Sequence, residues 1–322
     1  MQFLKGKNVE FSDLIGPMSL VAMFAFFAIH NPNFASPGNL VNLLKQASSL
    51  LVVATGSTIV ILMGSIDLSV DGVVTLSGVI TVLIANAWMD MGMASLFFCV
   101  LASLAAGAAI GVINGVLVTR LKLPSFLVTL GMSTICRGLS LISTNGTSVP
   151  CRSAAFKEIG RSYLLGIPLI GIVAVIILAV FSIISVKTRF GRHIYAVGGG
   201  ERVAALCGVP TEKTKLLSFT LASALAGLAG VIVSSRIGSA SNIQGDGMAL
   251  DAITAVVMGG TALNGRRGGV WRTLIGVMII IMISNGLNML GVPTYTQILI
   301  KGLVVILAVA VTSDRKTKMI VK

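Results

Sequence analysis

The chain has 322 residues, of which 55% are hydrophobic and 11% are charged, and its formal net charge at pH 7 is +13. A soluble domain carries about 25% charged residues, so this composition excludes an ordinary soluble protein and indicates a membrane protein. The basic residues lie in short stretches between long apolar runs, as the positive-inside rule expects, so the charge does not indicate a nucleic-acid-binding protein.

Ten apolar runs follow one another along the chain, and many approach the roughly 20 residues that cross about 30 Å of hydrocarbon. The sequence therefore predicts an all-α polytopic membrane protein with about ten transmembrane helices, forming a single transmembrane domain over residues 1–322. The predicted spans are Leu14–Ile29, Ala47–Met63, Gly72–Ala87, Met93–Val118, Ser125–Ser143, Leu164–Val186, Leu216–Ser234, Ala249–Ala262, Val270–Leu290 and Gln297–Thr312.

The basic residues also predict the orientation of these spans. With the N-terminus inside, the even-numbered spans end beside the densest basic clusters, so both termini are expected in the cytoplasm. The clusters are Arg120 and Lys122; Lys187, Arg189 and Arg192; Arg266, Arg267 and Arg272; and Arg315, Lys316, Lys318 and Lys322.

The stretch from Gly64 to Gly72 interrupts the second and third apolar runs with glycines and two carboxylates. A charge at membrane depth costs about 2.5–3.5 kcal/mol on insertion scales, so Asp67 should face protein or water. Either the stretch lines a transport path, or Asp67, with Ser69 as the alternative, caps the third helix at the membrane boundary. The cap is favoured, because a boundary carboxylate needs no buried partner.

Polar residues inside later spans are further candidates for a path. Arg137 in the fifth span is the most isolated intramembrane charge, and such a residue pairs, reaches the interface or lines water. Asn114 in the fourth span, and Asn285 with Asn288 in the ninth, complete this set.

Short matches between spans predict an inverted repeat of five plus five helices, with halves 1–160 and 161–322, as transporters often have. The matches pair Ile113-Asn-Gly-Val-Leu117 with Ser284-Asn-Gly-Leu287, and Arg137-Gly-Leu139 with Lys301-Gly-Leu303.

Two longer connections are expected outside the membrane, over residues 144–163 and 235–248. The first carries three basic residues against the single acid Glu158, which is unusual for an exterior loop under the positive-inside rule. The connections either dock a partner or are solvated loops whose charges aid solubility. The candidate docking residues are Arg152, Lys157, Arg161 and Arg236.

No stretch predicts a nucleotide, metal or catalytic site. The glycine-rich stretches Gly198–Gly200 and Gly259–Gly269 lack the spacing of phosphate-binding loops. The four cysteines form no C-x-x-C pair and the two histidines have no partner at ligand spacing. The chain is therefore expected to be no enzyme and to hold no cofactor, with any ATP and Mg²⁺ bound by a partner ATPase.

Short motifs, each weak alone, recur in an order and on spans that are specific together. They are Pro32-Asn-Phe34 with Asn39-Leu-Val-Asn-Leu43; Ile66-Asp-Leu-Ser-Val70; Thr144-Asn-Gly146; Thr188-Arg-Phe-Gly-Arg192 with Tyr195-Ala-Val-Gly-Gly199; Leu250-Asp-Ala-Ile253 with Val256-Val-Met-Gly-Gly-Thr261; and Asn285-Gly-Leu-Asn288. Through them the chain resembles, over nearly its whole length, the permease subunit of a bacterial ABC importer for monosaccharides of the ribose, xylose, arabinose and galactose group.

The resemblance implies a multi-pass protein of the bacterial inner membrane, surrounded by lipid and paired with an identical or similar permease subunit. It also implies two cytoplasmic ATPase domains and a periplasmic sugar-binding protein. The basic segment after the sixth span is similar to the family's coupling helix, here about Gly199 to Val209, with Glu201 in its first turn and Pro210 limiting its length. The expected coupling residues are Gly199, Gly200, Glu201, Val203, Ala204, Ala205, Leu206 and Gly208, and the expected apolar face consists of Val203, Ala204, Leu206 and Cys207.

Four positions depart from the pattern of the family. Asp71 and Arg266 stand where glycine is expected, Gly200 where asparagine is expected, and Ala249 where an acid is expected. These departures bear on which sugar is transported rather than on the family.

Three other classes of protein are weaker alternatives. An ABC permease for branched-chain amino acids shares the general design. A secondary transporter keeps ionisable groups near mid-membrane, whereas Asp67, Asp71 and Asp251 are expected near span ends. A structural or signalling membrane protein would need an added soluble domain.

Overall fold

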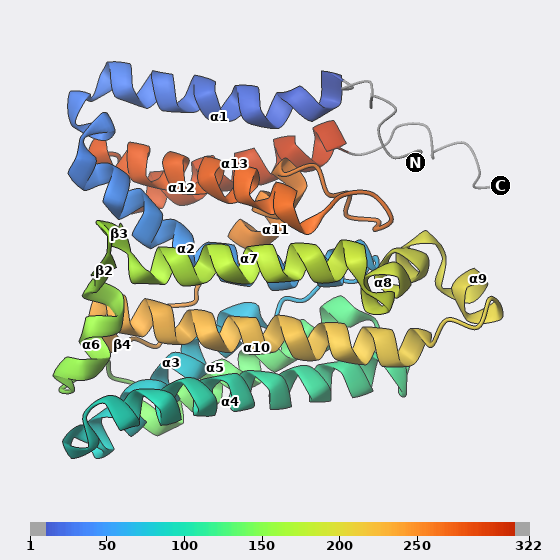
Figure 1. The fold of residues 1–322 in the computed structure, drawn as a ribbon, viewed down its shortest axis with the longest axis horizontal. Coiled ribbons are helices and arrows are strands. Elements are labelled where there is room, and N and C mark those ends of the chain that lie inside the picture. The colour runs from blue at the N-terminus through green and yellow to red at the C-terminus, as the bar shows by residue number, and fades with distance from the viewer. Residues whose placement is uncertain (1–10, 313–322) are drawn as a thin grey trace.

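A computed structural model describes residues 11–312 of the chain. The long helices lie side by side along the longest axis of the molecule, and the sheets within these residues are two two-stranded ribbons (Figure 1). The ten apolar helices are α1 (Phe11–His30), α2 (Pro37–Leu62), α3 (Val70–Ala87), α4 (Met93–Thr119), α5 (Ser125–Thr144), α7 (Leu169–Lys187), α10 (Thr211–Ile237), α11 (Met248–Met258), α12 (Thr273–Met289) and α13 (Thr294–Thr312). The shorter elements are α6 (Ala154–Arg161), α8 (Arg189–Gly199), α9 (Glu201–Leu206), η1 (Pro32–Ala35), η2 (Met89–Met91), η3 (Val270–Arg272), β1 (Val149–Pro150), β2 (Tyr163–Leu164), β3 (Ile167–Pro168) and β4 (Ser239–Ala240).

The helices confirm the predicted all-α membrane fold. Seven of them are long and apolar enough to cross a membrane, and three shorter apolar helices lie within α1, α11 and α13. Together they correspond to the ten predicted spans. The basic cluster from Arg315 to Lys322 lies outside the described residues.

Several predicted spans differ in their bounds from the helices that form, and the second and the eighth show the physical reasons. α2 begins at Pro37, ten residues earlier than predicted, because Ser36 accepts the N–H of Asn39 and proline occupies the first turn. α11 ends at Met258, because Gly260 adopts a φ of 86° that breaks the helix. Its 11 residues span only about 16 Å, too short for a hydrocarbon core of about 30 Å.

The core of the bundle is built on α2 and α10. Residues 47–62 of α2 are buried throughout, and α10 packs most extensively on α4. A stripe of small residues on α4, Gly107, Gly111 and Gly115, makes this contact: a Cβ on Gly107 would lie 2.3 Å from the carbonyl oxygen of Ser223. The stripe therefore packs helices within one subunit, as expected for small residues at close crossings.

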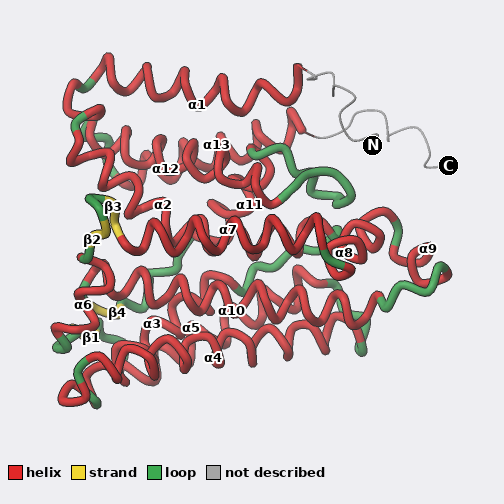
Figure 2. Tube along the Cα trace, viewed as in Figure 1, coloured by secondary structure: helices red, strands yellow, loops and turns green. Residues whose placement is uncertain are grey.

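The two ends of the bundle carry different elements (Figure 1). One end, the α6 end, holds α6 with the antiparallel pairs β1–β4 and β2–β3. The other, the α8–α9 end, holds α8 and α9, the start of α1 and the end of α13. Figure 2 shows that loops also lie between the helices inside the bundle, and two of these, residues 63–69 and 241–247, contribute to the candidate site.

Candidate translocation and coupling sites

Residues 241–247, here named the re-entrant segment, run from the α6 end into the bundle beside α3. At the α6 end, Asn86 near the end of α3 donates to the carbonyl of Pro150, next to the β1–β4 pair that precedes the segment. At the deep end, Gly247 donates to Asp71 in the first turn of α3. Asp71 precedes Asn86 by 15 residues, which is about 22 Å of helix. The sequence places this stretch outside the membrane, so the structure corrects that expectation.

The re-entrant segment contacts the backbone of α3 directly. Thr75 accepts the N–H of Gly245 at 3.2 Å, and Gln244 donates to the carbonyl of Val74 at 3.3 Å. A Cβ atom on Gly245 would lie 2.2 Å from the carbonyl oxygen of Asp71. Glycine is therefore required at 245 by the close approach of two backbones.

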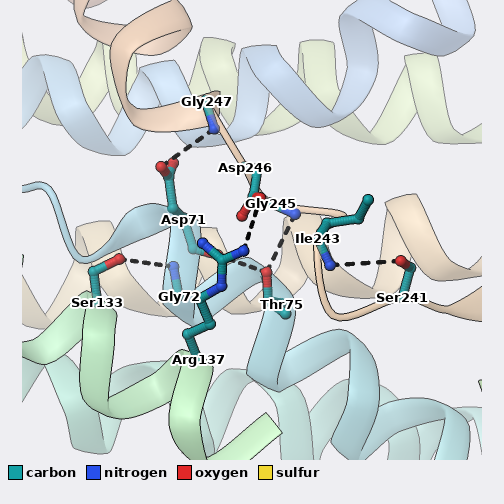
Figure 3. Close-up of polar contacts among 10 residues, drawn as sticks. All are labelled: Asp71, Gly72, Thr75, Ser133, Arg137, Ser241, Ile243, Gly245, Asp246 and Gly247. Carbon is teal, nitrogen blue, oxygen red and sulfur yellow. Dashed lines mark hydrogen bonds and ion pairs between the residues drawn. The ribbon is translucent and has the colours of Figure 1, made fainter. Parts of the chain in front are cut away.

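Asp71 caps the first turn of α11 from a neighbouring helix. Its carboxylate accepts the N–H groups of Gly247 at 3.3 Å (Figure 3) and of Ala249 at 2.5 Å. Gly247 occupies the N-cap position and makes no side-chain cap, and negative charge is favoured at a helix N-terminus. Asp71 and Ala249, two of the four positions that depart from the family pattern, are therefore joined by a hydrogen bond.

An ion pair connects α5 to the deep end of the re-entrant segment. Nη2 of Arg137 lies 3.2 Å from Oδ2 of Asp246 (Figure 3), and the two side chains are 50% and 43% exposed. Ionisable residues within transmembrane segments face protein or water-filled cavities and mark substrate pathways. The sequence identifies Arg137 but not Asp246, whose Gly-Ser-Asn-rich surroundings have the composition of an external loop.

Three other predicted path residues meet at the break between α2 and α3. Oδ1 of Asp67 accepts the N–H and the hydroxyl of Ser69 at 2.9 and 2.5 Å, and the amide of Asn114 donates to that hydroxyl at 3.0 Å. All three side chains are buried, so they hold the break together rather than line an open path. Ser69 occupies the N-cap position, but its hydroxyl bonds to Asp67 instead of the helix. The structure thus differs from the favoured prediction, in which Asp67 caps the third helix at the membrane boundary, because the Asp67 carboxylate is buried.

The remaining predicted path residues lie on α12. Asn285 is buried and accepts a hydrogen bond from Asn39 near the start of α2 at 3.0 Å, whereas Asn288 is exposed. α12 packs mainly on α1, α2 and α11, while α5 packs mainly on α3 and α4. The structure therefore does not bring these two residues to the Arg137–Asp246 pair.

The predicted coupling segment, Gly199 to Val209, forms one short helix, α9, at the α8–α9 end. Glu201 opens α9, as predicted, and its carboxylate pairs with Lys215 of α10. Gly200 separates α8 from α9 with a φ of 153°, a value that side chains rarely adopt. The helix is shorter than predicted, so Gly199 ends α8 and Gly208 follows α9.

The exposed face of α9 differs by one residue from the predicted apolar face. Val203 and Leu206 are 66% and 83% exposed, and Ala205 and Cys207 are exposed beside them. Ala204, in contrast, is buried. The free apolar face of this helix therefore consists of Val203, Leu206 and Cys207.

The glycine-rich turn between α11 and α12 packs onto α8 and the end of α2. A Cβ on Gly265 would lie 2.7 Å from the backbone nitrogen of Gly64. Tyr195 of α8 donates to the carbonyl of Gly268 at 3.1 Å, and burial raises the pKa of this tyrosine, which keeps it a donor. Close packing thus accounts for these glycines. Within residues 11–312, no group of three His, Cys, Asp or Glu side chains could hold a metal ion.

The predicted docking residues gather near the α6 end. Arg152 and Arg161 are exposed and Lys157 is half-buried. Arg236 is half-buried too, and its guanidinium donates to the carbonyl of Lys45 at 3.3 Å. The ammonium of Lys45 lies 4.6 Å from the centroid of the Tyr163 ring, and it adds a basic residue that the sequence analysis missed.

Comparison with known proteins places this architecture among transport proteins. Residues 39–309 match the family described as branched-chain amino acid transport system / permease component. The chain is 40% identical to the ribose import permease protein RbsC of Bacillus subtilis, with 96% of each chain covered. It is 38% identical to RbsC of Escherichia coli K12 over 98% of this chain and 97% of that one. It is 33% identical to the xylose transport system permease protein XylH of Haemophilus influenzae over 98% and 100%. No solved structure matches it.

Proposed function

The chain belongs to the family of branched-chain amino acid transport system permease components, and we propose that it is the membrane-spanning subunit of an ABC importer for a monosaccharide of the ribose class. The similarity to ribose and xylose permeases over almost the full length of both chains carries this proposal. The description of the family favours a second candidate substrate, a branched-chain amino acid. The relatives named for sugars make that candidate the weaker one.

The translocation path follows the Arg137–Asp246 pair, between α5 and the re-entrant segment. A guanidinium beside a carboxylate offers donors and acceptors to neighbouring sugar hydroxyls, and the pair has no net charge, which suits a neutral substrate. The half-exposed state of both side chains supports this assignment. A second permease subunit, identical or similar, closes the path by covering the exposed side of α5.

The α8–α9 end faces the cytoplasm, where α9 docks on the partner ATPase that binds ATP and Mg²⁺. The basic residues at this end, among them Arg189 and Arg192, support this orientation under the positive-inside rule. The free apolar face of α9 supports the contact itself. The α6 end then receives the periplasmic binding protein through its basic residues.

Uptake into liposomes tests the proposal. The permease is reconstituted with its co-purified ATPase and binding protein, and labelled ribose and leucine are offered separately. ATP-dependent uptake of the sugar, without competition from leucine, is the expected result. Uptake of leucine alone would favour the second candidate. Sugar uptake that needs an ion gradient and no ATPase would contradict both.

A further inference from the structure

The helix α11 begins inside the bundle, at the deep end of the re-entrant segment. The first N–H groups of a helix have no partners within it, and the interior of a membrane supplies little water to bind them. Asp71 accepts two N–H groups at this point, from Gly247 and Ala249. The start of α11 is therefore held by a side chain of α3 that lies 178 positions earlier in the sequence.

The same contact fixes the position of Asp246. This residue lies between Gly245, whose N–H is bound by Thr75, and Gly247, whose N–H is bound by Asp71 (Figure 3). With its neighbours held on α3, its carboxylate lies beside the Arg137 guanidinium on α5. The geometry of the ion pair thus depends on the anchoring of the segment.

We propose that Asp71 is a positioning residue for the translocation path. Its carboxylate fastens the deep end of the re-entrant segment to α3 and so places Asp246 beside Arg137, where the pair contacts the sugar. Asp71 binds the backbone N–H of Ala249, so a carboxylate supplied at position 249 would lie on α11 itself. With glycine at position 71, such a carboxylate can cap α11 but does not fasten it to α3. The contact with sugar rests on the proposed function, whereas the anchoring does not.

The test measures release of the segment and transport separately. Met248, the first residue of α11, is partly buried against the core. Met248→Cys in a protein lacking the native cysteines therefore provides a thiol that maleimide should reach faster when the segment is released, in the absence of sugar. Into this protein are introduced Asp71→Gly, Asp71→Asn, Ala249→Glu and the double variant D71G/A249E. Sugar uptake is measured for the same variants in liposomes.

Asp71→Gly is expected to raise the labelling rate about tenfold, as loss of a helix cap implies. It should lower the maximal uptake rate more than it changes the half-saturating sugar concentration. Asp71→Asn should have a smaller effect, and Ala249→Glu alone should raise labelling by bringing two carboxylates together. The double variant should stay close to the labelling rate of Asp71→Gly, since its carboxylate caps α11 without joining it to α3. Ser133→Ala is the control, because Ser133 accepts the N–H of Gly72 from α5.

A double variant that restores both readouts overturns the proposal, because a cap on α11 would then suffice without attachment to α3. If Asp71→Gly gives no folded protein, equal labelling of Asp71→Asn and Ser133→Ala overturns it as well. Faster labelling of Asp71→Gly in a permease whose parent moves no sugar supports the anchoring and refutes the proposed function. Sugar uptake with labelling that is unchanged by Asp71→Gly refutes the anchoring alone.

Discussion

Arg137 lies on α5, one of the helices long enough to cross a membrane, and forms an ion pair with Asp246 in which both side chains are about half exposed. A pair on a water-exposed surface contributes little to stability. In a site with less water, removing one partner leaves the other charge unpaired. The free-energy cost of that unpaired charge exceeds the cost of removing both charges together. The pair should therefore behave as one functional element.

Replacing Arg137 by glutamine, or Asp246 by asparagine, should each lower the sugar uptake rate about tenfold or more, because an unpaired charge then faces the path. In the double variant R137Q/D246N, the sugar uptake rate should fall by a smaller factor than the product of the factors for the two single variants. Arg120→Gln is the matched control, because Arg120 pairs with Glu212 at an exposed site and should change little. Multiplicative losses in the double variant would show that the pair is not a unit.

The sequence reveals half of this site, for a physical reason. A lone arginine inside an apolar run is conspicuous, so Arg137 is recognised without a structure. Asp246 and Asp71 are not recognised from the sequence, because their roles depend on distant contacts. Asp246 pairs with a residue 109 positions away, and Asp71 binds residues 176 and 178 positions away. The composition of residues 241–247 is that of a turn, and only packing against α3 draws them into the bundle.

At the scale of helices, the sequence predicts the number of helices and their order better than it predicts their lengths. The predicted second span misses the first turns of α2, because Asn39, Asn42 and Lys45 interrupt the apolar pattern there. α3 packs on α4 and α5, and α11 packs on α12 and α13. Lys301 of α13 pairs with Asp251 of α11 at 2.8 Å within the second half, whereas Arg137 of α5 pairs with Asp246 of the other half. The two pairs are therefore not equivalent, and the inverted repeat stays a prediction.

The helix α9 allows a test of coupling that leaves the bundle intact. Leu206→Asp should reduce the stimulated ATPase activity of the assembled transporter about tenfold, the effect of burying one uncompensated charge in an interface. The thermal stability of the isolated permease should be unchanged, because Leu206 is 83% exposed. A substitution at Ala204 would not serve, because that residue is buried.

Leu165→Asp provides the matched control for this change, since Leu165 is 96% exposed in the turn between β2 and β3 at the opposite end. It should leave the stimulated ATPase activity as it is in the parent. Equal losses in the two variants, or none in Leu206→Asp, would show that α9 is not the coupling surface.

At the scale of the whole molecule, the two ends of the bundle present different chemistry. The orientation follows from single cysteines placed at Lys157 in α6 and Lys213 near the start of α10, in a background without the native cysteines. An impermeant thiol reagent added outside should label position 157 and not position 213. A third labelling site, at position 316 in the C-terminal basic cluster, should likewise be inaccessible from outside, but it lies outside the described residues. The opposite labelling would exchange the surfaces assigned to the ATPase and the binding protein.

The α6 end should attract a binding protein whose surface is acidic. Replacing Arg152, Lys157 and Arg161 together by glutamate should slow association about tenfold at low ionic strength, since complementary charge acts mainly on the association rate. The salt dependence of the rate should weaken, because salt screens the attraction that these residues supply. Arg236 is left unchanged, because its guanidinium already bonds within the permease. Association is measured on permease in nanodiscs at two salt concentrations.

A triple reversal at the α8–α9 end separates a local surface from a general effect of net charge. Arg189, Arg192 and Lys213 are all exposed there, and their replacement by glutamate changes the net charge by the same amount. Association with the binding protein should then remain close to the parent rate, because charges more than about 10 Å away are screened at 0.1 M salt. Equal slowing by the two triple variants would mean that net charge, and not the α6 end, attracts the binding protein. Unchanged rates in both would leave the start of the connection after α10, residues 235–240 with Arg236, as the next candidate for docking.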